Sequence, residues 1–368
     1  MTKAAELAKM GEVLANSQIG RKNIIINGGM QIAQRSTSET GLGAASGYFT
    51  LDRFYIVENA ASDGRFTMSQ SAVTDLEGFS NALKIDCTTA DTSIAAGEAL
   101  ILQHNIEGFN LQQLKATSTT TRAMTLSFYA KSNASRAIAT ELRLVNGTNR
   151  QASKLHTIGT SWARYTFTVP AASSTQIDND NSVEMSVNFW LHGGTTFTGG
   201  TLSATFEASN NANRAAGIGS IFASTDNEIE ITGIQLEVGS QATPFEHRSF
   251  GEELALCQRY YAHYDANNDY GRLAVGENAT TTEAQNYIFP AVEMRAVPTL
   301  VTSGNVNHYA LYNSADIKTV TGIILGSASS TKVVYFQTTV SSGLTDGGAS
   351  QLMTNNNSSY YLALDSEL

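Results

Sequence analysis

The feature that most constrains the fold is a series of short runs in which apolar and polar residues mostly alternate. The runs lie between residues 23 and 246, and clusters rich in Gly, Asn and Ser separate them. They are 24–26, 66–69, 83–85, 124–128, 165–169, 185–189 and 229–232. Because successive side chains of a strand point to opposite faces, this period of two predicts strands with one buried face. The pattern predicts an antiparallel jelly-roll β-sandwich over residues 23–247.

A short helix is expected before the sandwich, in residues 1–22. Leu7, Met10 and Leu14 recur at spacings of three and four, with charged residues on the other face. A helix of about four turns is not stable alone in water, so it should dock. Its own chain, sister copies and a larger assembly are all possible partners.

A second helical segment is expected at residues 248–266. Ser249 and Glu252 fit a capping box, and Leu254, Cys257, Tyr261 and Tyr264 follow at spacings of three, four and three. Such a narrow apolar stripe could pack on the neighbouring sandwich. Three copies packed around an axis would bury the same stripe, and the spacing alone favours neither arrangement.

The strand pattern returns in residues 267–368, which are expected to form a small C-terminal β domain. Its runs are 272–275, 287–297, 332–340 and 360–364. Pro290 and Pro298 cannot donate backbone hydrogen bonds, so the run at 287–297 must bend or lie at an edge. The chain as a whole is therefore expected to be mainly β, with two short helices.

Charge and composition exclude several classes of partner. The net charge of −10 lacks the cationic surface that neutralises phosphates, so we expect no nucleic-acid partner. No apolar run reaches about 18 residues, so no membrane insertion is expected. Only 15% of the residues are charged, and the surface should be rich in hydroxyl and amide groups. The two cysteines, Cys87 and Cys257, are expected to be reduced thiols.

A search for catalytic and cofactor motifs is negative. The sequence lacks a phosphate-binding loop, a zinc-binding helix motif and a serine-nucleophile elbow. We therefore expect no enzyme, no cofactor and no metal. Asp178 and Asp180 form the densest oxygen cluster, which could hold a hard cation such as Ca²⁺. A solvated turn is the preferred interpretation of that cluster.

Aromatic residues suggest carbohydrate recognition instead. Trp and Tyr rings can stack on the apolar faces of sugars while neighbouring amides bond the hydroxyls. Trp162 and Trp190 are candidates in the sandwich, although alternation also fits core packing there. The candidates for sugar contact in the C-terminal domain are Tyr270, Tyr309, Tyr312 and Tyr360, which would become receptor-binding residues if the resemblance described below holds.

An ordered succession of strings resembles a family of bacteriophage tail-fibre and virion proteins. Their opening pattern, N-L-I-N-G, W-Q-R and then Y-T-A-D-R-W, is similar to NIIING at 23–28, QR at 34–35 and YFTLDRF at 48–54. The likeness continues through QHNIEG at 103–108, LSFYAKS at 126–132, WARYT at 162–166, IQLEVG at 234–239, PFEHR at 244–248 and EELALCQRYY at 252–261. A looser match, FPAVEMRAVPT, lies at 289–299.

The resemblance implies a virion structural protein, assembled in the host cytoplasm as a homotrimeric tail fibre. Its jelly roll would be like that of carbohydrate-binding modules, and its distal β domain would bind host cell-surface polysaccharide. The N-terminal residues would then attach to another phage tail or capsid protein, and the stripe at 254–264 would be the trimer interface. Related modules carry Ca²⁺ ligands where this chain has Gly29 and Gly233, so the sandwich could also be a simple spacer.

Three other functions stay open. A capsid decoration or head-fibre protein would share the fold and the trimer. A polysaccharide depolymerase would need a β-helix or a clear carboxylate pair, and the sequence has neither signal. A bacterial surface adhesin is disfavoured because the N-terminus lacks a signal sequence.

Overall fold

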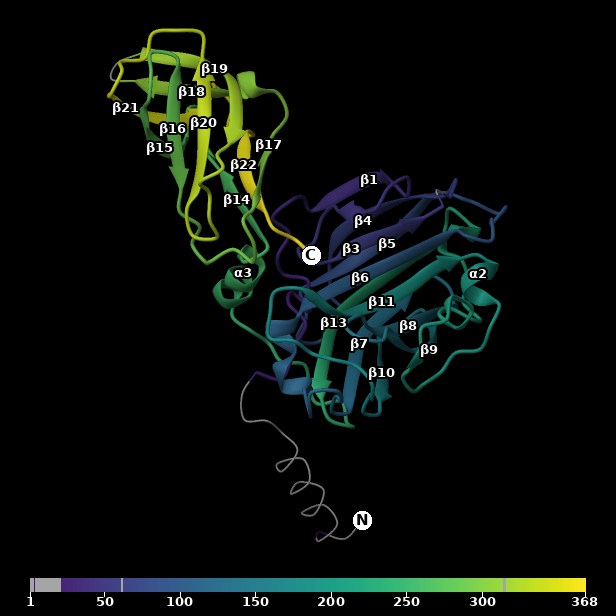
Figure 1. Cartoon of the computed structure of the whole chain (residues 1–368). Helices are drawn as coiled ribbons and strands as arrows, with labels where there is room; N and C mark the ends of the chain where they lie inside the picture. The colour runs from purple at the N-terminus through teal and green to yellow at the C-terminus, as the bar shows by residue number, and fades with distance from the viewer. Residues whose placement is uncertain (1–2, 4–20, 61, 314–315) are drawn as a thin grey trace. The chain divides into compact units, whose positions relative to one another are not determined.

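The structure is a computed structural model that describes residues 3, 21–60, 62–313 and 316–368. Two compact units divide the chain: one ends at Phe250 and includes Leu368, and the other is Gly251–Glu367. We call them the sandwich unit and the barrel unit; Figure 1 labels their strands. The predicted attachment helix, with Leu7, Met10 and Leu14, lies outside the described residues. No helix within the described ranges is long and apolar enough to cross a membrane.

The sandwich unit consists of two antiparallel sheets, which confirms the predicted β-sandwich. The six-stranded sheet A has the order β1 (Ser38–Leu42), β4 (Arg65–Ala72), β5 (Asn81–Thr89), β13 (Glu228–Val238), β7 (Met124–Ser132) and β10 (Ala163–Val169). The seven-stranded sheet B has the order β12 (Glu207–Ala208), β9 (Arg150–Ile158), β8 (Arg136–Leu144), β11 (Val183–Gly193), β6 (Ala99–Glu107), β3 (Tyr55–Asn59) and β2 (Gly47–Tyr48).

Alternation along the strands decides which face of each sheet is buried. In β7, Met124, Leu126 and Phe128 are fully buried and belong to the main core. In β11 of the other sheet, Phe189 has the same role, and its ring meets Phe128 edge-on at a centroid distance of 5.1 Å. The core therefore fills the space between the two sheets, as in other sandwiches.

The run at 24–26 was predicted as a strand, and that prediction is wrong. The segment is an irregular turn, although all three isoleucines are buried. The side chain of Asn23 accepts hydrogen bonds from the backbone N–H groups of Ile25 and Leu236, and its amide donates to Ile234 O at 3.0 Å. These contacts fasten the turn to β13 and take the place of strand pairing.

A separate small core covers part of the outer face of sheet B. Residues 194–220, which include α2 (Thr195–Thr198) and η2 (Asn211–Asn213), pack Phe197 against Trp190 at a centroid distance of 5.1 Å. Beneath them, the fully buried Glu141 accepts hydrogen bonds from Asn188 and Trp190 and pairs with Arg214 at 2.8 Å. Trp190 is therefore held in a buried network.

The barrel unit begins at the second residue of α3 (Phe250–Gln258) and contains two sheets. A three-stranded sheet has the order β14 (Tyr261–Asp265), β22 (Tyr361–Asp365) and β17 (Thr299–Thr302). The closed barrel has the order β15 (Arg272–Asn278), β16 (Glu283–Ile288), β20 (Val334–Val340), β19 (Asp316–Leu325), β18 (Tyr309–Asn313) and β21 (Ala349–Thr354). Short 3₁₀ turns elsewhere are η1 (Gly108–Leu114), η3 (Ile221–Ala223) and η4 (Val306–His308).

The helix predicted over 248–266 is shorter than expected. It ends at Gln258, and Tyr261 and Tyr264 lie in β14. β14 pairs with β22 in unbroken register from Tyr261–Asp365 to Asp265–Tyr361. Strand pairing with β22 is therefore favoured over continuation of the helix beyond Gln258. As a result, the four predicted interface residues form no continuous helical stripe.

The long run at 287–297 also divides. β16 ends at Ile288, immediately before Phe289 and Pro290, and the next strand, β17, begins at Thr299 after Pro298. The two prolines thus mark the ends of an irregular connection, as their missing N–H groups require.

Candidate functional site

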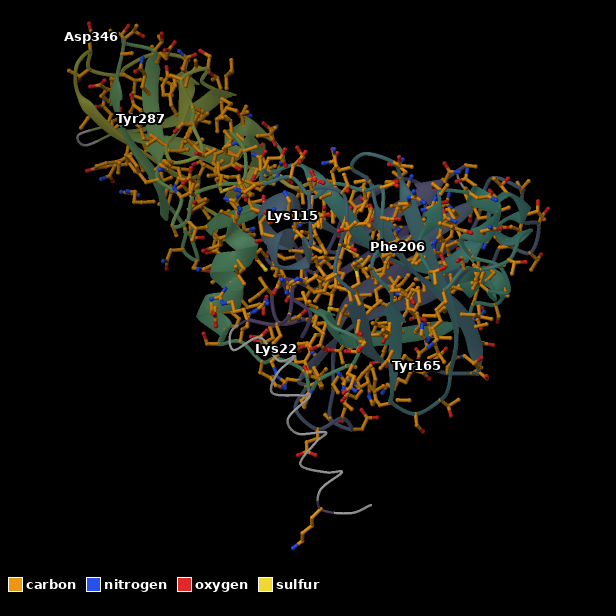
Figure 2. All side chains as sticks on the ribbon, turned by 60° about the horizontal axis from the view of Figure 1, so that its bottom comes forward. Lys22, Lys115, Tyr165, Phe206, Tyr287 and Asp346 are labelled. Carbon is orange, nitrogen blue, oxygen red and sulfur yellow. The ribbon has the colours of Figure 1, made fainter. Side chains whose placement is uncertain are left out.

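The outer wall of the barrel carries a cross-strand row of large side chains. The strand registers pair Tyr312 with Gln351, Gln351 with Val275, Val275 with Tyr287, and Tyr287 with Tyr335. These five residues come from β18, β21, β15, β16 and β20. Because the partners in a register share a face of the sheet, the row follows the outside of the barrel. Figure 2 labels Tyr287 within it.

The first facet of this wall is a tyrosine pair. The rings of Tyr287 and Tyr335 have centroids 5.6 Å apart and planes inclined by 30°. Beside them, Val275 is 56% exposed and Ile324 is 64% exposed. Tyr335 packs over Gly326, where an added Cβ would lie only 2.0 Å from the ring.

Amide side chains lie next to this pair. Gln285 pairs with Gln337 in the adjacent register position of β16 and β20, two residues from the tyrosines. Both glutamines are partly exposed. The facet therefore combines aromatic faces with amide donors and acceptors.

The second facet is organised by Arg272. Its guanidinium carbon lies 5.0 Å from the centroid of the Tyr312 ring, and its Nε donates to Gln351 Oε1 at 2.6 Å. Its Nη1 donates to the backbone carbonyl of Tyr270 at 2.6 Å. Arg272 thus brings together two of the four tyrosines that were predicted to bind a receptor.

The other two predicted tyrosines, Tyr309 and Tyr360, are not part of this facet, and of the four only Tyr312 belongs to the row itself. Tyr309 is fully buried, and its hydroxyl donates to Tyr361 O at 2.5 Å and accepts from Ser303 N at 2.8 Å. Burial raises the pKa of Tyr309 above its usual value. Its prediction as a receptor-binding residue is wrong, because a core hydroxyl cannot reach a ligand. Tyr360 stacks on His308 at 3.9 Å, with the planes inclined by 2°.

Sequence reasoning missed Tyr287, Tyr335 and Gln351. Each occupies an outward position of an alternating strand, and that signal is present in the sequence. What the sequence does not supply is the register that aligns them across strands.

The two tryptophans of the sandwich have different surroundings. Trp190 is fully buried, which excludes it as a ligand contact in this fold. Trp162 is partly exposed, its Nε1 donates to Asp75 Oδ1 at 2.8 Å, and the Lys131 ammonium lies 5.0 Å from its ring centroid. The Trp162 hydrogen bond and the Lys131 charge hold the pKa of Asp75 below its usual value. Trp162 is thus already engaged by charged neighbours.

The predicted trimer-interface residues lie in two elements. Leu254 is partly buried and Cys257 fully buried in α3, and Tyr261 is buried in β14. The hydroxyl of Tyr264 is buried without a hydrogen-bond partner among the residues that the structure describes, and burial raises its pKa to about 12. The other cysteine, Cys87, is a free thiol in the sandwich core, as expected.

An acidic group lies at the start of β11. Asp178, Asp180 and Glu184 bring carboxylate oxygens within 4.8 Å of one another. Glu184, which the sequence analysis did not single out, is only 2% exposed. Burial, followed by the charges of Asp178 and Asp180, raises the pKa of Glu184.

Comparisons with known proteins give a likeness of fold. No family model and no curated protein matches the chain. The tailspike protein 4 enzymatically active domain of bacteriophage CBA120 is 14% identical with a TM-score of 0.31, and the match covers 59% of this chain and 21% of that one. The family 11 carbohydrate-binding module of a Clostridium thermocellum cellulosomal cellulase is 10% identical with a TM-score of 0.28, covering 57% and 99%. TmCBM61, solved with β-1,4-galactotriose, is 8% identical with a TM-score of 0.29, covering 60% and 100%.

This chain spans about a fifth of the tailspike chain. The sheet topology, rather than these likenesses, carries the assignment of the fold.

Proposed function

We propose that this chain is a structural protein of a phage virion, a homotrimeric tail fibre that binds a host-surface glycan through the barrel wall and catalyses no reaction. The observation that carries the glycan-binding part is the cross-strand row from Tyr312 to Tyr335, with its aromatic faces and amide groups. The virion part rests on the ordered strings of residues 23–261.

The barrel wall suits glycan binding better than the sandwich does. Trp190 is buried, and Trp162 is engaged by Asp75 and Lys131. Tyr287 and Tyr335, in contrast, lie beside exposed Val275 and the amides of Gln285 and Gln337. Sugars need apolar faces for stacking and nearby amides for their hydroxyls, and this facet has both. The sandwich then serves as a spacer.

Weak single contacts would suffice in a trimer. Three barrels that engage one polysaccharide layer convert later contacts into intramolecular ones, which raises avidity by about a hundredfold or more. Sedimentation of the full chain at micromolar concentration tests this step. A monomer under those conditions would contradict the trimer but not the glycan site.

The glycan site is tested with the full chain on a panel of immobilised bacterial surface polysaccharides. Losing both aromatic rings in Tyr287→Ala/Tyr335→Ala should weaken binding by about tenfold or more. The matched control is Trp162→Ala, which removes an aromatic ring from the sandwich and should leave binding unchanged.

If the tyrosine variant binds normally and Trp162→Ala does not, the site lies on the sandwich. If the unmodified chain binds no polysaccharide of the panel, the glycan proposal is wrong. Release of reducing ends from a bound polysaccharide would contradict the non-enzymatic assignment.

A further inference from the structure

Hydrogen bonds to the backbone hold the segment that carries Asp178, Asp180 and Glu184 in place. Phe109 N donates to Asp180 O at 2.9 Å, and the side-chain amide of Gln112 donates to Asp178 O at 2.8 Å. Glu184 is the second residue of β11 itself. The three carboxylates are therefore held close together by η1 and by the sheet, although their charges repel one another.

Neighbouring side chains and backbone N–H groups donate hydrogen bonds to these carboxylates, and the backbone of Asp178 is among the donors to Glu184. Asn146 Nδ2 donates to Asp178 Oδ2 at 2.9 Å and to Glu184 Oε1 at 2.8 Å, and Ser182 N donates to Asp180 Oδ1 at 2.9 Å. The other oxygen of Glu184, Oε2, is buried and accepts no hydrogen bond from any described residue.

A buried carboxylate oxygen without a partner is costly, and two further carboxylates beside it increase that cost. The nearby ammonium group of Lys115 donates to a backbone carbonyl, Ile177 O, at 2.8 Å. The charges that act on Glu184 are those of Asp178 and Asp180, and no cation within the described ranges offsets them.

We infer that Asp178, Asp180 and Glu184 bind a Ca²⁺ ion, with Glu184 Oε2 as the buried ligand. Oxygens on opposite sides of Ca²⁺ lie about 4.6–5.2 Å apart, and those around Mg²⁺ about 4.0–4.2 Å apart. One oxygen of each carboxylate lies within 4.8 Å of the others, a spacing that falls within the span of a Ca²⁺ coordination shell. Water completes the coordination shell, since Asp178 is exposed.

The ion would bind a single segment, 178–184, that hydrogen bonds connect to two segments distant in sequence. Asp178 and Asp180 belong to the loop before β11, Asn146 follows β8, and Gln112 belongs to η1. Because the unfolded chain has no such site, bound Ca²⁺ stabilises the sandwich unit by mass action.

The test uses the full chain after treatment with EGTA. Calorimetric titration with CaCl₂ should give one site per chain, and millimolar Ca²⁺ should raise the midpoint of thermal unfolding by several degrees. MgCl₂ at the same concentration should produce a much smaller shift. Glu184→Gln and Asp178→Asn should each weaken Ca²⁺ binding at least tenfold.

Asp346→Asn, which removes an exposed carboxylate of the barrel unit, is the matched control and should bind Ca²⁺ normally (Figure 2). Since Asp178 is exposed, its variant should fold even if Glu184→Gln does not. Retention of full Ca²⁺ affinity by Asp178→Asn would overturn the site. Absence of Ca²⁺ binding in the unmodified chain, with Glu184→Gln more stable than it, would identify Glu184 as a protonated acid instead.

Discussion

The two units differ in what they leave exposed. In the sandwich unit, the large apolar side chains at the surface are Ile94, Phe109, Leu155 and Phe250. In the barrel unit, which is less than half as long, they are Tyr270, Val275, Phe289, Val297, Ile317 and Ile324. The barrel also carries its tyrosine row on the outside, whereas the sandwich buries Trp190 beneath an added layer. A unit that buries its aromatic residues is suited to a structural role, and a unit that exposes them is suited to binding another molecule.

The units also differ in where they place charged pairs. Glu141 and Arg214 of the sandwich are buried at 0% and 9% exposure, whereas Lys318 and Asp316 of the barrel pair at the surface. Burial makes the loss of one partner expensive, because the other charge is left without compensation. Exposed pairs contribute little.

The largest effect is expected from Arg214→Met. It leaves the Glu141 carboxylate buried without its cation and should lower the free energy of unfolding of the sandwich by about 3–5 kcal/mol. Both tryptophans of the chain, Trp162 and Trp190, belong to this unit, so tryptophan fluorescence during denaturant unfolding reports on it selectively.

Lys318→Met is the matched variant of the barrel, and far-UV circular dichroism during denaturant unfolding should show almost no loss, because its partner Asp316 is exposed. If Arg214→Met and Lys318→Met lowered the free energy of unfolding equally, the proposed difference between buried and exposed charged pairs would be wrong.

A smaller effect is expected from Tyr309→Phe. It removes the hydroxyl that bonds Tyr361 O and Ser303 N and should destabilise the barrel by about 1–3 kcal/mol. Far-UV circular dichroism during thermal unfolding measures this loss. Glycan binding of the folded variant should be normal, and a selective loss of binding would return Tyr309 to the site.

The smallest effect is a change in pH dependence from Glu58→Gln. Burial, opposed in part by the hydrogen bond from Ser62 N and by Arg65, raises the pKa of Glu58 to about 7. The folded state therefore holds this proton more tightly than the unfolded state, so its contribution is complete below about pH 4.5 and is lost as the pH rises through 7.

Urea unfolding at pH 4 and pH 8 checks this. Glu58→Gln should match the unmodified chain at pH 4 and exceed it by about 1 kcal/mol at pH 8, a value reduced for partial solvent exposure. An identical pH profile for the two proteins would show that Glu58 titrates normally.

The alternation of side chains made most of the sandwich predictable. Residues 124–128 and 185–189 form strands because their apolar positions can all reach one core. The run at 24–26 was wrongly predicted as a strand. Its three isoleucines are buried in a turn, because the Asn23 side chain forms the hydrogen bonds that backbone N–H groups there require. Tyr261 and Tyr264 misled because helical spacing and strand alternation overlap over short runs, and pairing with a strand about 100 residues away decided between them.

The candidate site was less predictable than the fold. Tyr270, Tyr312 and Tyr360 could be proposed from residue type, but Tyr309 has the same type and is buried. Tyr287 and Tyr335 are 48 positions apart in sequence and become neighbours only through the register of β16 and β20. Non-local pairing of this kind leaves no local signal.

The closure of the barrel determines which of its side chains can touch an extended polymer at the same time. Because the six strands form a ring, Tyr312 and Tyr335 at the two ends of the row face different directions. One straight polymer cannot touch both at once. The wall therefore has separate contact surfaces on several sides of the barrel. A barrel that approaches a polymer layer can be rotated about its own axis and still present an aromatic face to the layer.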